Sequence, residues 1–100
     1  MARGSVNVLV GGGLPPITTT ITTTWTGSSA PYTQTISVSG ITADDTPIVA
    51  PVYSETNATA ILQQEAWNLI SSIVTGDGSI TLTCFGTKPT IEIPIQVKGV

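Results

Sequence analysis

The sequence predicts an α+β fold, an antiparallel β-sandwich or sheet with one amphipathic helix packed across it. Three observations predict this class. Apolar residues alternate with hydroxyl residues in several segments, as they do in strands with one buried face. One central segment instead repeats its apolar residues at helical spacing. The 100 residues suit a single domain, and we expect the order strand, strand, helix, strand, strand.

The chain divides into an arm or linker over residues 1–16 and a β-rich body over residues 17–100. Residues 6–10 are expected to form a short strand or an arm that packs on a neighbouring molecule. Gly11-Gly12-Gly13-Leu14-Pro15-Pro16 follows, where glycine gives freedom and the two prolines favour an extended backbone. We therefore expect the arm to be separate from the body.

The first two strands are expected over residues 17–26 and 32–41. Nearly every residue of the first is β-branched, which favours a strand. Alternation would place Ile17, Ile21 and Trp25 on one face. The other face would carry the threonines Thr18, Thr20, Thr22, Thr24 and Thr26. With the turn at residues 27–31 between them, the two segments predict an antiparallel hairpin.

The helix is expected at about residues 55–75. Glu55 would lie at the positive end of the helix dipole, and Gly76 would terminate the helix. The apolar stripe consists of Ala58, Ile61, Leu62, Ala66, Leu69, Ile70, Ile73 and Val74. Strands are then expected over 79–85 and 90–98. Pro94 has no N–H, so the last strand is predicted to lie at a sheet edge or to carry a bulge.

Charge excludes several function classes. Only 9% of residues are charged, against roughly 25% in a typical domain, and threonine is the commonest residue. Three basic residues provide no cluster for nucleic acid. No apolar run approaches the roughly 20 residues of a membrane span, and the N-terminus lacks the apolar region of a secretory signal. We expect synthesis in a cytoplasm and a surface buried against partners or further copies.

The sequence offers no catalytic, metal-binding or cofactor-binding residues, so we expect a protein that is not an enzyme. Histidine, the usual general base, is absent. Cys84 lies on the apolar face of its strand and is interpreted as a buried, inert thiol. The pair Asp44-Asp45 is compatible with part of a cation site or with an Asx-type turn, and the turn is favoured.

Two surface interpretations remain open. Trp25 and Tyr32 lie near a turn, where they would either stack on sugars or pack in a core or interface, and packing is the preferred interpretation. Thr20, Thr22 and Thr24 belong to a hydroxyl-rich face. Such a face would bind ice or polysaccharide, or it would belong to a strand that pairs with another chain, which is the preferred interpretation.

An ordered set of short segments resembles a small domain of virion proteins from tailed phages and prophages of Gram-positive bacteria. In that family the domain is often found at the C-terminal end of fibre-like proteins. The resemblance spans residues 25–100. It is carried by Trp25-Thr26-Gly27, residues 30–35 and 38–49, Glu65-Ala66-Trp67, Lys88-Pro89-Thr90 and residues 93–98.

This resemblance implies a homotrimeric structural accessory protein of the virion. The short arm favours a head-fibre or capsid-decoration type over a long fibre, with capsid or other virion proteins as partners. Two alternatives are a module that binds host-surface glycans and a small phage effector, such as an enzyme inhibitor. Whether the position is head, neck or tail stays open.

Overall fold

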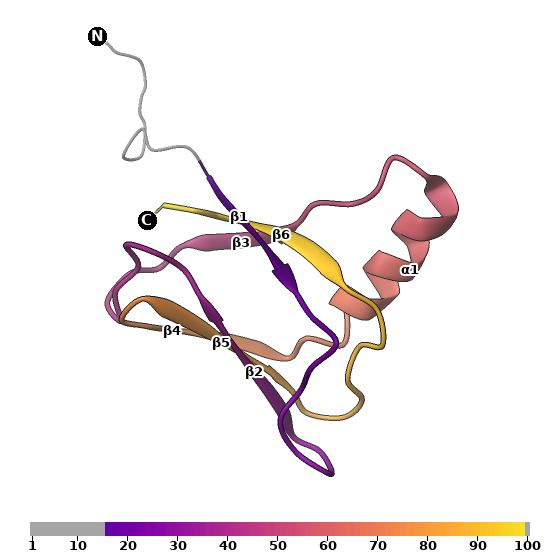
Figure 1. Cartoon of the computed structure of the whole chain (residues 1–100), viewed down its shortest axis with the longest axis horizontal. Coiled ribbons are helices and arrows are strands. Elements are labelled where there is room, and N and C mark those ends of the chain that lie inside the picture. The colour runs from indigo at the N-terminus through magenta and orange to yellow at the C-terminus, as the bar shows by residue number, and fades with distance from the viewer. Residues whose placement is uncertain (1–15, 100) are drawn as a thin grey trace, which may run out of the picture.

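Two small antiparallel sheets and one helix make up the protein in the computed structural model, which describes residues 16–99. The sheets have the strand orders β1-β6-β3 and β2-β5-β4. Figure 1 shows them as two layers, with the helix beside one end of the layers. The elements are β1 (Ile17–Ile21), β2 (Tyr32–Ser37), β3 (Ile48–Pro51), α1 (Asn57–Trp67), β4 (Ser72–Gly76), β5 (Ser79–Cys84) and β6 (Ile93–Lys98).

The hydrophobic core lies between the two sheets. The alternation expected in the last two strands is confirmed, because every second residue there is buried. These residues form one cluster with Ile21 of β1 and Ile36 of β2, so the core joins the two layers of a sandwich. The central strands contribute Ile80, Leu82, Cys84, Ile93, Ile95 and Val97.

The first hairpin was predicted wrongly. β1 pairs with β6 and β2 pairs with β5, so the two segments belong to different sheets. A single bridge between Thr26 and Thr33 is all that pairs them directly. β1 already ends at Ile21 and β2 at Ser37, shorter than the expected segments. Alternation identifies the faces of a strand but not its partner, because pairing depends on residues far away in the chain.

The helix is shorter than expected. It ends at Trp67, and residues 72–76, predicted as its last turns, form β4. The N–H of Ser71 donates to the carbonyl of Thr83 at 2.7 Å, which starts the pairing of this segment with β5. Ile73-Val74-Thr75 is a β-branched run, so its preference for a strand and its pairing with β5 outweigh the helical spacing.

Pro94 was predicted to mark an edge strand or a bulge, but β6 is the central strand of its sheet. The geometry explains the exception. The N–H of Val52 donates to the carbonyl of Pro94 at 2.8 Å, so the nitrogen of Pro94 also faces Val52. β3 has ended at Pro51, one residue earlier. The missing N–H therefore coincides with the end of the β3–β6 ladder, where its loss costs little.

Candidate interaction surfaces

Trp25 lies in the hydrophobic core. Its side chain is 8% exposed and belongs to the central cluster. Within the described residues, its buried Nε1 has no hydrogen-bond partner. Tyr32 is half-buried, and the Nζ of Lys88 lies 5.0 Å from the centre of its ring. Of the two interpretations of these aromatic residues, packing is therefore the one that their positions favour.

The threonine face expected over residues 18–26 does not continue beyond β1. Thr20 belongs to β1, but Thr22 and Thr24 follow the end of the strand. There the buried Gln34 binds the backbone: its Oε1 accepts from the N–H of Thr22, and its Nε2 donates to the carbonyl of Thr24. The side-chain amide thus takes the place of a strand partner and interrupts the alternation.

A different hydroxyl face forms on the outside of the β2-β5-β4 sheet. The hydroxyl of Thr35 lies 3.1 Å from that of Thr81, which is its direct partner on the neighbouring strand. The rows across the sheet are Thr33–Thr83–Ser72, Thr35–Thr81–Val74 and Ser37–Ser79–Gly76. All of these residues are uncharged. Alternation predicted the hydroxyl sides of β2 and β5 separately, but only the register places them in one surface.

The free edge of β1 turns backbone groups outward. Because the N–H of Val52 binds Pro94, the even-numbered residues of β6 face β3 and the odd-numbered ones face β1. Ile17, Thr19 and Ile21 are the partners of those odd residues. The N–H and C=O groups of Thr18 and Thr20 consequently point away from the sheet, and this edge continues directly from the N-terminal arm.

The helix buries little of its apolar surface. Its buried residues are Gln63 and Ala66, and the Oε1 of Gln63 accepts a hydrogen bond from the N–H of Ser54 at 2.8 Å. Ile61 and Leu62 remain 47% and 54% exposed. The stripe read from the sequence is thus divided: Ala66 packs inward, while the two larger side chains face solvent. This division was not predictable from spacing, because it depends on which side of α1 meets β6.

An open groove of about 310 Å³ lies beside the helix. Its lining includes Leu62 and Leu69 from the helix side, and Pro89 and Ile91 from the segment before β6. Glu65 and Lys88 provide one acidic and one basic group. The groove is thus mainly apolar with both signs of charge, a composition typical of surfaces that bind protein.

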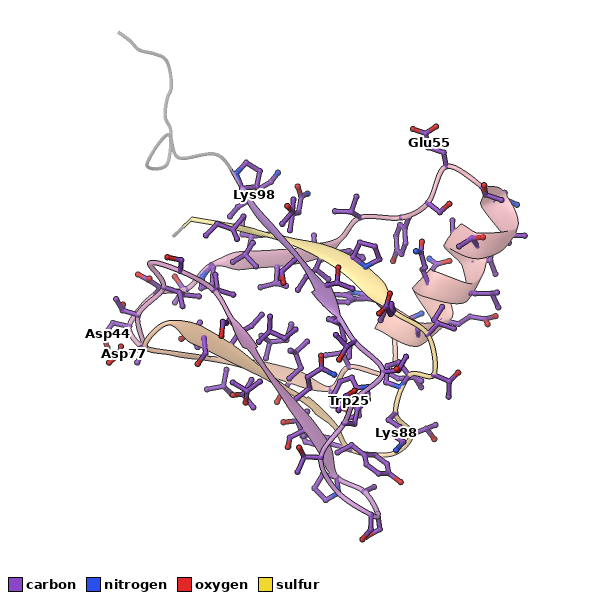
Figure 2. All side chains as sticks on the ribbon, in the orientation of Figure 1. Trp25, Asp44, Glu55, Asp77, Lys88 and Lys98 are labelled. Atoms are coloured by element: carbon purple, nitrogen blue, oxygen red, sulfur yellow. The ribbon has the colours of Figure 1, made fainter. Side chains whose placement is uncertain are left out.

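Figure 2 shows Asp44 and Asp77 near each other at one end of the molecule, whereas Lys88 lies toward the other end. Asp45 fixes its own loop by accepting the N–H of Thr42 at 2.9 Å, and Asp77 accepts the N–H of Ala43. Asp45 thus fixes its loop, as the favoured interpretation expected, but its carboxylate binds a residue three positions earlier and does not form an Asx turn. Among residues 16–99, no group of three or more His, Cys, Asp or Glu side chains could hold a metal ion.

Cys84 is fully buried in the core, as its position on the apolar face predicted. Burial raises the pKa of its thiol, because the interior disfavours the thiolate. The nucleophilic form is therefore suppressed in the folded protein, which agrees with the interpretation of an inert thiol.

Comparison with known proteins finds no match among family models, curated proteins or solved structures. In the part of the chain that the structure describes, no helix combines the length and apolarity needed to cross a membrane.

Proposed function

We propose that this chain is a structural accessory protein of a tailed-phage virion, of the head-fibre or capsid-decoration type. It is homotrimeric and attaches through its N-terminal arm to capsid or other virion proteins. The resemblance over residues 25–100 supports the family, and the charge content of 9% supports a surface made for contact with other subunits.

The free edge of β1 is the observation that carries the attachment mechanism. Thr18 and Thr20 offer unpaired backbone groups at the point where the arm joins the body. Such an edge accepts an extended segment by strand addition. The opposite edge of this sheet is less suitable, because Pro51 of β3 has no N–H to donate. Residues 6–10, expected to form a short strand or to pack on a neighbouring molecule, lie outside the described residues.

Removal of residues 1–16 tests the role of the arm. The shortened chain should keep its circular dichroism spectrum, since the core of the described part of the chain is complete without this arm, but lose attachment to phage particles in co-sedimentation. Attachment as strong as that of the full chain would contradict the proposal. The full chain should give a solution mass three times its 10.3 kDa by light scattering.

A pair of proline substitutions tests strand addition at β1. Thr20→Pro removes an N–H that points outward, so the β1–β6 ladder survives while pairing with an added strand is blocked. Thr19→Pro is the matched control, because its N–H faces Ile95 of β6 and its loss should destabilise the fold itself. Attachment that persists in a folded Thr20→Pro variant would exclude this edge as the docking site.

The second candidate function is recognition of host-surface glycans. It is favoured by the uncharged hydroxyl face on the β2-β5-β4 sheet, where Thr35 and Thr81 lie side by side. Thr35→Lys and Thr81→Lys would place charge in this face without disturbing the core, and binding to a glycan array should then be lost. A folded wild-type protein that binds no glycan on the array would remove this candidate.

A further inference from the structure

The helix α1 carries apolar side chains that face solvent and do not pack against the core. Ile61 and Leu62 face solvent on one side of α1, and Leu62 also lines the groove of about 310 Å³. The helix meanwhile places Gln63 inward, where its amide binds the backbone of Ser54. The larger apolar side chains of this helix therefore stay exposed to water in the single chain, and contact with another surface would bury them.

A large apolar side chain lies at the same end of the molecule. Phe85 is 66% exposed and is separated by one residue, Gly86, from the segment that lines the groove. Its N–H donates to the hydroxyl of Ser71 at 2.9 Å, two residues beyond Leu69 of the groove. The chain therefore carries a projecting aromatic ring and an apolar hollow close together. When both features belong to one chain, copies can bind one another in a cyclic order.

The charges at the groove also favour a second copy. Glu65 and Lys88 both line it, so the surface carries one acid and one base. A strongly acidic or basic partner would meet one like charge, whereas another copy can place its Lys88 near Glu65.

We propose that the surface formed by Ile61, Leu62 and the adjoining groove is the contact face between copies of this chain. Phe85 of one copy enters the groove of the next copy. Across the same contact, Glu65 of one copy faces Lys88 of the other. This rests on the proposed homotrimer and names the surface that forms it.

The test uses the full chain and its solution mass by light scattering. Leu62→Glu should reduce the mass threefold, from the trimer to the 10.3 kDa monomer, because it places a charge in the apolar contact. Gln64→Glu is the matched control: it adds the same charge to an exposed position of the same helix, and the trimer should persist. Phe85→Ser should dissociate the trimer in the same way as Leu62→Glu.

Charge exchange adds a second readout. Glu65→Lys and Lys88→Glu should each weaken the trimer, and the double variant should restore it. A wild-type trimer that Leu62→Glu leaves intact would overturn this contact face while leaving the virion proposal standing. A wild-type monomer at every concentration would overturn both the contact face and the trimer. If Leu62→Glu dissociates the trimer and the wild-type protein fails to attach to particles, the result would support the contact face and contradict the virion role.

Discussion

Gln34 binds both backbone groups of Thr22. Its Oε1 accepts the N–H of Thr22 at 2.8 Å, and its Nε2 donates to the carbonyl of Thr22 at 3.0 Å. The same nitrogen also reaches the carbonyl of Thr24 at 3.0 Å. Since Gln34 belongs to β2 and Thr22 follows β1, one side chain connects the two layers of the sandwich.

Gln34→Leu should lower the free energy of unfolding by about 2–4 kcal/mol. The substitution keeps an apolar stem but leaves the backbone groups of Thr22 and Thr24 without partners. Urea unfolding followed by circular dichroism measures the change. Gln64→Leu, at an exposed position of α1, is the control and should stay within about 0.5 kcal/mol of wild type. Equal stability of the two variants would contradict a structural role for the amide.

Leu82→Ala should destabilise the protein by about 2–5 kcal/mol, since Leu82 is fully buried between the sheets and its truncation leaves a cavity. Ile48→Ala removes a comparable side chain that is 68% exposed and should cost less than about 1 kcal/mol. Thermal unfolding of both variants checks the difference. A similar cost at the two positions would place the core elsewhere.

Cys84 should react with a thiol reagent only when the protein unfolds. Burial holds its pKa above the ordinary value, so the folded state keeps the neutral thiol as pH rises. In the unfolded state the thiol ionises at its ordinary pKa, and this ionisation stabilises the unfolded state. The free energy of unfolding should therefore fall as pH rises above the ordinary thiol pKa. Urea titrations between pH 7 and 10 test this. The Cys84→Ala variant should lack the part of this decline that comes from the thiol. An equal decline of the free energy of unfolding in both proteins would contradict the role of Cys84.

Gly78→Ala should cost about 1–2 kcal/mol. Gly78 follows Asp77 in the turn between β4 and β5 and has a φ of +79°, where L residues are strained. A Cβ there meets no atom within 4 Å, so the cost comes from the backbone alone. Gly78→Asn should be less destabilising, because asparagine tolerates this region better. Thermal unfolding of both variants provides the comparison, and a greater loss with asparagine would argue against backbone strain.

The candidate surfaces were only partly predictable. Alternation identified the hydroxyl sides of β2 and β5, and it placed Trp25 on the same face as Ile21; both of these residues are buried in the core. The exposure of Leu62 and the groove beside it carried no local signal. Both depend on which side of α1 meets the sandwich.

What the sequence determined by itself is local. Alternation of period two marked Ile80, Leu82 and Cys84 as core residues, because neighbouring residues on a strand must point to opposite sides. Tertiary structure alone decided the partners: β1 lies against β6 and not β2, and residues 72–76 pair with β5 and do not extend α1. The physical reason is that strand pairing joins residues far apart in the chain, where no short segment carries the information.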